Sequence, residues 1–438
     1  MNVSKLNKYE NRLNLNISTN SMNNLIKQLG CHMDIAADAS PMCEPLTLSN
    51  GRIIPNRYVV QPLEGCDSEE DGSPSQLTLR RYKRFAKGGS GVIWVEAVAV
   101  SLQGRGHNHM LYLHEQSLGN FKELVDIVRV NTNEGPHAIN PFIVLQLHHS
   151  GRYGQTPKIV FHDECLDKTS PNVKNYKELS DYELERIAND FVRTGALAKS
   201  AGFDAVDVKC CHGYLLYELL RARTRKGQYG GDYEHRTRLI FSIIDRLLSE
   251  VGIACTVRMD AYSGENFPYS WGVDETGELL LDEPIRFAKD LASHGVCMLN
   301  ISNGNPWTNP YLSRPFNHQG KPPEHPMVSI DRLLHCAAAI QREVPHIPVV
   351  ASGLSGLRQF GPKIASSLIS SDSISFAGFG RQAFAYPDLP KDVFFTGELD
   401  AKKTCMVCDG CIRLLETGKP AGCVVHDKEV YRLNDSVQ

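Results

Sequence analysis

The stretch FDAVDVKCCHGY, residues 203–214, joins a short apolar run to a dense group of polar side chains. The run is rich in β-branched residues, which is typical of a strand. It directly follows LSDYELERIANDFVRTGALAKSAG, residues 179–202, in which apolar residues recur at helical spacing. A helix that leads at once into a strand with Lys, Cys, His and Tyr at its end indicates one repeat of an α/β fold.

Seven further apolar runs recur along the chain. They are RYVVQP (57–62), GVIWVEAVAV (91–100), PFIVLQL (141–147), ACTVRM (254–259), VCMLNIS (296–302), IPVVAS (347–352) and SISFAGFG (373–380). Helical stretches separate them, for example LTLRRYKRFAKG (77–88), EHRTRLIFSIIDRLLSEVG (234–252) and SIDRLLHCAAAIQREV (329–344). Eight strand–helix pairs predict an α/β fold of the (β/α)8 TIM barrel type. A doubly wound sheet is the alternative, but its Gly-rich dinucleotide fingerprint after the first strand is absent.

Composition and charge restrict the class of protein. Hydrophobic residues form 42% of the 438 residues and charged residues 22%, so a full core can be buried. The net charge of −3, without runs of like charge, favours neither nucleic acid nor an anionic membrane as a partner. The chain has no apolar stretch of about 18 residues, and its Asn-rich beginning lacks the apolar core of a signal peptide. We therefore expect a cytoplasmic protein. Residues 1–50 are expected to form an extension that is helical in part or disordered.

Four of the 13 cysteines are clustered behind the predicted barrel of residues 51–398. Cys405, Cys408, Cys411 and Cys423 have the spacing C-x2-C-x2-C-x11-C and define a segment of residues 399–438. Three cysteines in a short loop and a remote fourth suit a [4Fe–4S] cluster. Four thiolates also suit a structural zinc ion, and the spacing alone does not decide between the two. The other nine cysteines are scattered and are expected to be mostly small apolar core residues.

The active site of a TIM barrel lies at the carboxyl ends of its strands, and many barrels bind a phosphate after strands seven and eight. In this sequence those loops are ASGLSG (351–356) and GFGRQ (378–382), with glycines where a backbone must approach a ligand closely. Arg381 adds a cation. The two loops together predict a phosphate site.

Several blocks of the sequence resemble the old yellow enzyme / NADH:flavin oxidoreductase family. The blocks are QLHHSGR (146–152), AGFDAVDVKCCHGYLLYELL (201–220) with RKGQYGGDYEHRTR (225–238), VRMD (257–260) and GFGRQAFAYPDLP (378–390). The resemblance implies FMN at the top of the barrel and NADH or NADPH as electron donor. It assigns the flavin phosphate to Ser352, Gly353, Gly380 and Arg381, the pyrimidine end to Gln146, the N1 region to Arg258, and the flanks of the flavin ring to Pro62 and Ala97.

The same resemblance assigns Lys209 and His212 to the substrate's carbonyl oxygen and Tyr214 to the proton that the α carbon receives. Relatives more often have His where this chain has Lys209, and a full cation there predicts an anionic or strongly polarised substrate. An internal salt bridge of Lys209 with Glu64 or Glu96 is the alternative. Glu64 is a second departure, because many relatives carry Thr at that position.

The cysteine spacing is similar to that of the family's iron–sulfur branch, which includes trimethylamine dehydrogenase and 2,4-dienoyl-CoA reductase. Those proteins continue into a further nucleotide-binding half, whereas this sequence stops about fifteen residues after Cys423. Without a second flavin, electrons are expected from NAD(P)H or from an external carrier through the cluster. We favour reduction of an activated C=C bond, of the enone or enoate type. Dehydrogenation of an amine and a non-catalytic electron-transfer subunit stay open, as does assembly into a homo-oligomer.

Overall fold

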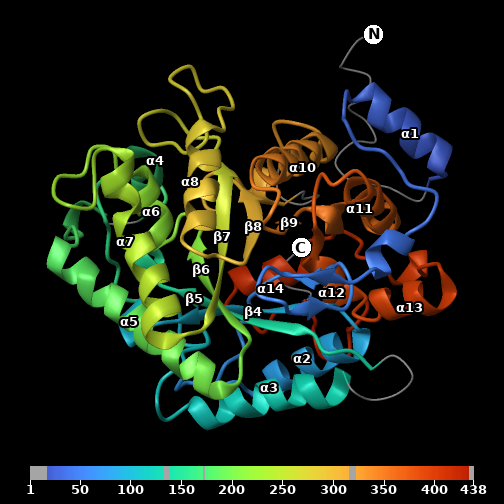
Figure 1. Ribbon diagram of the computed structural model, residues 1–438, viewed down its shortest axis with the longest axis horizontal. Helices are drawn as coiled ribbons and strands as arrows, with labels where there is room; N and C mark the ends of the chain where they lie inside the picture. The colour runs from blue at the N-terminus through green and yellow to red at the C-terminus, as the bar shows by residue number, and fades with distance from the viewer. Residues whose placement is uncertain (1–16, 133–137, 171–172, 315–321, 434–438) are drawn as a thin grey trace.

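Eight parallel strands close into a barrel in the order β10-β3-β4-β5-β6-β7-β8-β9 (Figure 1). The computed structural model describes residues 17–132, 138–170, 173–314 and 322–433. The strands are β3 (Tyr58–Val60), β4 (Val92–Ala99), β5 (Phe142–His148), β6 (Ala205–Cys210), β7 (Ala254–Tyr262), β8 (Met298–Asn303), β9 (Val349–Ala351) and β10 (Phe376–Phe379). Each of the eight apolar runs contributes one strand, so the predicted TIM barrel is confirmed.

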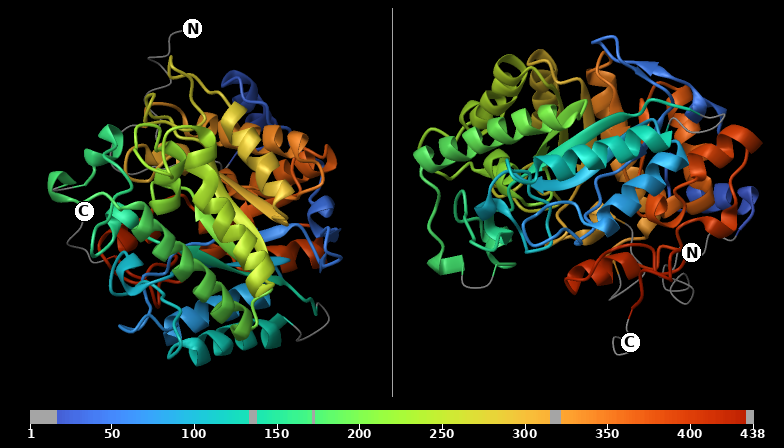
Figure 2. Two further views of the ribbon diagram at one scale, coloured as in Figure 1. Left: turned by 60° about the vertical axis from the view of Figure 1, so that its left-hand side comes forward. Right: turned by 90° about the horizontal axis from the view of Figure 1, so that it is seen from below.

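Helices surround the barrel (Figures 1 and 2). The longer ones are α2 (Gln76–Gly88), α3 (Leu118–Thr132), α5 (Asp181–Ala201), α7 (Tyr233–Arg246), α8 (Asp282–Ser293), α10 (Pro326–Glu343), α11 (Gly361–Ser370) and α13 (Leu389–Thr396). Helix α5 begins in a capping box of Ser180 and Glu183 and ends at Gly202, whose φ of 94° is left-handed, so local sequence sets both ends. Among the described residues, no helix is both long and apolar enough to cross a membrane.

Shorter elements fill the loops. They are η2 (Ser40–Cys43), η3 (Leu102–Gly104), η4 (Gly151–Tyr153), α4 (Glu164–Asp167), η5 (Val173–Asn175), α6 (Leu215–Arg221), the π turn η6 (Leu247–Val251), α9 (Pro310–Ser313), η7 (Leu354–Phe360), α12 (Arg381–Ala385), η8 (Ala401–Lys403) and α14 (Gly410–Glu416). Three of these, α9, α12 and α14, bear on the site described below.

A hairpin of β1 (Leu46–Thr47) and β2 (Ile53–Ile54) packs onto the amino-terminal end of the barrel. Leu48 and Ile54 of this hairpin join a buried cluster with inward-facing strand residues such as Val59 and Trp94. The hairpin spans the boundary predicted at residue 50, so part of the extension belongs to the barrel core. Its packing leaves the opposite end of the barrel for the functional site.

The N-terminal extension lies along the outside of the barrel beside α10 and α11, where Figure 1 shows it in blue. Its helix α1 (Thr19–Gln28) buries Met22 and Ile26. The backbone N–H of His32 donates to Asp331 of α10 at 2.7 Å. The expected short helix is present over residues 19–28, and residues 1–16 lie outside the described part of the chain.

The C-terminal cysteine segment packs against the barrel through polar contacts. Asp427, which is buried, forms ion pairs with Arg80 (2.8 Å) and Arg84 of α2. The backbone N–H of Ala421 donates to the carbonyl of Gly65 at 2.7 Å, in the loop after β3. The segment is thereby attached to the carboxyl-terminal face of the barrel, where α14 lies near α12 in Figure 1.

Candidate active site

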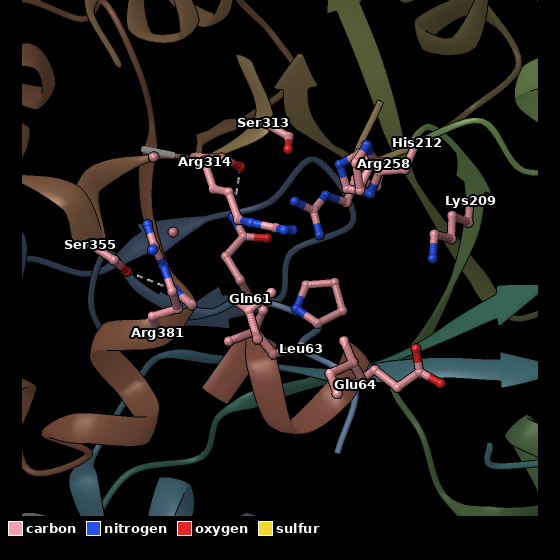
Figure 3. Close-up of a pocket in the computed structure, with 18 of the residues that line it drawn as sticks. Gln61, Leu63, Glu64, Lys209, His212, Arg258, Ser313, Arg314, Ser355 and Arg381 are labelled. Atoms are coloured by element: carbon pink, nitrogen blue, oxygen red, sulfur yellow. Dashed lines mark hydrogen bonds between the residues drawn. The ribbon is translucent and has the colours of Figure 1, made fainter. Parts of the chain in front are cut away.

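A pocket at the carboxyl ends of the strands contains nine of the eleven residues predicted to bind flavin or act on substrate. The nine are Pro62, Lys209, His212, Tyr214, Arg258, Ser352, Gly353, Gly380 and Arg381. Figure 3 shows Lys209 and Glu64 on one side of this pocket and Arg381 and Ser355 on the other, with Arg258 and Arg314 between them. The arrangement suits an elongated anionic ligand, because four of the lining side chains are cations.

Two of the predicted residues do not line the pocket. Gln146 lies within β5, and its amide donates to Asp207 on the neighbouring strand β6 at 2.7 Å. Burial raises the pKa of Asp207 to about 6, against the hydrogen bond from Gln146, which lowers it. Ala97 packs in β4 with Ala99 and Met110.

The end of the pocket that the sequence predicts to bind phosphate is built by the loops after β9 and β10. Gly353 has a left-handed φ of 88°, which allows the sharp turn out of β9. The hydroxyl of Ser355 accepts the backbone N–H groups of Gly380 (3.1 Å) and Gln382 (3.2 Å) and so joins the two loops. Arg381 is buried and forms an ion pair with Asp409 of the cysteine segment at 2.6 Å.

The middle of the pocket is lined by a side chain of β7 and by residues that directly follow β3 and β9. Gln61 exchanges hydrogen bonds with Asn300 (2.8 Å and 3.2 Å) and donates to the hydroxyl of Ser352 at 3.1 Å. Arg258 of β7 lines this region, and its Nε is buried without a hydrogen-bond partner among the described residues. A buried unpaired guanidinium N–H suits a ligand that brings its own acceptors.

Lys209 is buried on the side of the pocket opposite Arg381, with its Nζ 4.2 Å from the centre of the Tyr214 ring. Burial lowers its pKa below the ordinary value. Neither predicted salt bridge forms, because Glu64 binds His107 at 2.7 Å and Glu96 binds Arg81 at 2.6 Å.

His212 is neutral. Burial, together with the cations Arg258 and Lys209, holds the pKa of its imidazole well below the ordinary range. Its Nε2 lies 2.7 Å from the hydroxyl of Ser302. Its backbone, with a left-handed φ of 65°, donates to Asp260 at 2.8 Å. These contacts fix the position of His212 in the pocket.

Tyr214 stands directly before α6 and is surrounded by aromatic rings. His148 contacts it edge-on at 4.4 Å between centroids, and Tyr153 does so at 5.9 Å. Burial raises the pKa of the Tyr214 phenol, so it keeps its proton at neutral pH. His149 lies in a separate cleft with Ser101 and Lys158, so the adjacent side chains of His148 and His149 point to opposite faces of β5.

Comparison with known proteins identifies the fold's family. The model of the NADH:flavin oxidoreductase / NADH oxidase family matches residues 41–268. The chain belongs to this family. Its sequence is 31% identical over 389 residues to an NADH oxidase of Thermoanaerobacter brockii, covering 84% of this chain and 54% of that protein. The family membership confirms the resemblance drawn from the strand-end motifs.

Solved structures share the fold of this chain. A 2-naphthoyl-CoA reductase complex superposes with a TM-score of 0.73 at 20% identity, covering 88% of this chain and 57% of that one. Histamine dehydrogenase from Rhizobium sp. 4-9 gives a TM-score of 0.69 at 18% identity, covering 88% and 52%. The chain thus spans a little over half the length of these proteins.

The C-terminal cysteine segment reaches the pocket. Ile412 and Leu415 of α14 line it, one and four residues after Cys411. Cys405 and Cys423 each accept a backbone N–H, from Val407 (3.4 Å) and His426 (3.3 Å). Within the described residues, no three of the four clustered sulfurs lie within 4.8 Å of one another. Tetrahedral zinc, with bonds of about 2.3 Å, holds its sulfurs about 3.8 Å apart.

Sequence reasoning missed several lining residues. Ile412 and Leu415 recur at helical spacing behind a cysteine, which is a signal that a second element faces the site. Ser355 stands in the loop quoted as a phosphate site. Arg314 carries no local signal, because its place in the pocket depends on how the loop after β8 folds.

Proposed function

We propose that this chain is the flavin-binding part of a reductase that adds a hydride and a proton across the C=C bond of an α,β-unsaturated, anionic substrate. The observation that carries this proposal is the buried Lys209, which lies beside Tyr214 and forms no ion pair with a carboxylate among the described residues. A buried ammonium group needs a counter-charge. A substrate carboxylate, or an oxygen that gains charge during reduction, supplies it.

The lining residues fit FMN. Ser352, Gly353, Ser355 and Gly380 form the phosphate end, and Gln61, Pro62 and Arg258 line the part where the ring belongs. Bound FMN supplies the hydride, after reduction by NADH or NADPH. Arg258, with its unpaired Nε, favours the negative charge that collects near N1 on reduction.

The substrate groups act at the far side of the pocket from the phosphate end. Lys209 holds and polarises the substrate's oxygen with its ammonium group, and the neutral His212 gives a hydrogen bond without adding a second cation. Tyr214 donates its phenolic proton to the α carbon. Its surroundings suit this role, because burial keeps the phenol protonated.

Amine oxidation is a second candidate, since histamine dehydrogenase shares the fold. An alkylammonium substrate calls for an aromatic bowl or a free carboxylate. Trp94 and Trp271 are fully buried in the core, and Trp307 stacks on Tyr153 at 4.3 Å. Among the described lining residues Glu64 is the only carboxylate, and it is bound to His107. Repulsion by Lys209 and Arg258 therefore favours the reductase.

A [4Fe–4S] cluster on Cys405, Cys408, Cys411 and Cys423 completes the proposal. The cysteine spacing, which is similar to that of the family's iron–sulfur branch, and the two N–H···S contacts support a cubane. These four cysteines would hold the cluster, which would exchange single electrons with FMN. The electrons would come from NAD(P)H by hydride transfer to FMN, or from an external carrier through the cluster. The barrel and the cysteine segment then form one redox unit.

An ultraviolet–visible spectrum with iron and sulfide analysis, on anaerobically purified protein, tests the proposal. We expect flavin bands over a broad shoulder and about four irons per chain. Cys411→Ser should lose the iron and keep the FMN, whereas Cys165→Ser, outside the segment, should keep both. Zinc in place of iron would refute the cluster. A colourless protein would refute the reductase. So would a bound flavin that amines reduce and that unsaturated acids fail to reoxidise.

A further inference from the structure

A thiol, an imidazole and a carboxylate lie in line beside the pocket, in the loops after β3 and β4. The sulfur of Cys66 is 3.7 Å from Nδ1 of His107, and Nε2 of the same ring is 2.7 Å from the carboxylate of Glu64. Glu64 lines the pocket, and the other two residues are not among its lining residues. A nucleophile, a base within its reach and a third group that orients the base form the pattern of an activated side chain.

The loop that carries Cys66 is held in one conformation by buried contacts. Cys66 has a left-handed φ of 50°, which is uncommon for a residue other than glycine. Gly65, the residue before it, donates its N–H to Glu96 at 2.5 Å, and Asp67, the residue after it, forms an ion pair with Arg81. Because the backbone is held on both sides of the thiol, the sulfur is kept beside the imidazole before any reactant arrives.

The imidazole of His107 is oriented to take a proton from the sulfur. The backbone N–H of His109 lies 3.2 Å from Nδ1, so this nitrogen is an acceptor and Nε2 carries the hydrogen that faces Glu64. Burial lowers the pKa of the ring, but its contacts with Cys66 and Glu64 raise it more, to about 10. Nδ1 therefore has a high affinity for the proton of the thiol, and the thiolate is the nucleophilic form of cysteine.

Access to this thiol selects small reactants. Cys66 is 2% exposed, whereas the side chain of His107 is 37% exposed, so solvent reaches the imidazole and barely reaches the sulfur. Hydrogen peroxide is little larger than water and suits such a site. Cys43 and Cys165 are more exposed than Cys66, but burial and nearby carboxylates raise the pKa of their thiols. Exposure and activation therefore point to different cysteines.

We propose that Cys66 is a peroxide-reactive cysteine, with His107 as its base and Glu64 as the positioning residue of that base. The thiolate attacks one oxygen of a hydroperoxide, an S–O bond forms and the O–O bond breaks, so the sulfur is oxidised and the peroxide reduced. The departing oxygen takes the proton that His107 received from the thiol, and the products are a sulfenic acid and water or an alcohol. The reaction is separate from reduction of a C=C bond and uses neither FMN nor an iron–sulfur cluster.

Treatment of the folded protein with about one equivalent of hydrogen peroxide, and then with dimedone, which traps sulfenic acids, tests the proposal. Mass spectrometry follows the peptides that contain Cys66, Cys43 and Cys165 over time. Cys66 should be labelled about 10-fold faster than the other two or more, although they are more exposed. Exposure alone would give the opposite order.

Variants of the base and of its carboxylate separate activation from packing. His107→Asn should slow the labelling of Cys66 about 100-fold, the lower end for loss of general acid–base catalysis, and leave Cys165 unchanged. Glu64→Gln should also slow Cys66, by a smaller factor, because the base is still present. His235→Asn, which removes an exposed imidazole from an ion pair with Asp232, should change none of these rates.

Labelling of Cys66 that is no faster than that of Cys165 would overturn the proposal. An unchanged rate at Cys66 in His107→Asn would do the same. If His107→Asn loosens the fold, labelling of Cys165 rises as well, and Glu64→Gln then decides, since an unchanged rate at Cys66 in that variant would overturn the role of the imidazole. Protein without flavin should show the same order of labelling, so a failure of the proposed reductase function would leave this result intact.

Discussion

Replacement of Lys209 by Met tests the charge on which the substrate class depends. The change keeps a long unbranched side chain and removes the ammonium group 4.2 Å from the Tyr214 ring. Two opposite charges 4 Å apart attract by about 4 kcal/mol at an effective dielectric constant of 20. Desolvation offsets part of this, and hydrogen bonds to charged groups contribute about 1.5–3 kcal/mol net. An unsaturated carboxylate should therefore bind about 10- to 150-fold more weakly to the variant.

The assay is a titration of the flavin spectrum with α,β-unsaturated carboxylates, each paired with its primary amide. The amides have the same shape without the charge, so their dissociation constants should change little. Met also relieves the cost of a buried ammonium without a partner, so the free energy of unfolding should not fall. Equal weakening of acids and amides would show that Lys209 only shapes the pocket. Unchanged binding of the acids would refute the role of its charge.

Three other results follow from the structure. Tyr214→Phe should slow reoxidation of the reduced flavin by an unsaturated substrate about 100-fold or more, while reduction by NAD(P)H in stopped flow stays unchanged; parallel losses in both steps would argue against an acid role. Because burial lowers the pKa of Lys209, affinity for an anionic ligand should be full below that lowered pKa and fall as pH rises through it, and a neutral amide should show no such slope. Arg81→Met should lower the free energy of unfolding in urea by about 3–5 kcal/mol, since it leaves two carboxylates buried and unpaired; Gly65→Ala, whose methyl would collide with the Arg81 guanidinium, should act in the same direction, and Arg238→Met should not.

The barrel was predictable because its signal is local. Each strand is a short β-branched run, and each long helix has its own periodicity and caps, as in α5 between Ser180 and Gly202. The carboxyl-end rule then placed Lys209, His212 and Arg258 in one pocket, since parallel strands end on the same side of the barrel. No knowledge of loop conformation was needed for these residues.

Contacts between distant segments were not predictable. The partner of Arg381 is Asp409, in a segment whose docking depends on Asp427 and α2. Gln146 was assigned to the flavin through the family motif, and no signal in the sequence indicated that its amide also donates to Asp207 on the next strand. Sequence pattern gives the element on which a side chain lies. Which of several neighbours it binds is decided by packing of the whole molecule.

The closing pair of strands sets an order for the protein's synthesis. Tyr58 of β3 pairs with Ala377 of β10, about 320 residues later. The pocket is lined by residues at the ends of these two strands and by residues of α14, which follows them in the chain. At about 5–20 residues per second, the first strand leaves the ribosome roughly 15–60 s before its last neighbour. Until then one edge of the sheet is unpaired. It can form wrong contacts with other chains unless a chaperone covers it. The pocket is complete only after the cysteine segment has been translated, so flavin binds to a finished chain. Flavin binding then stabilises the folded state by mass action.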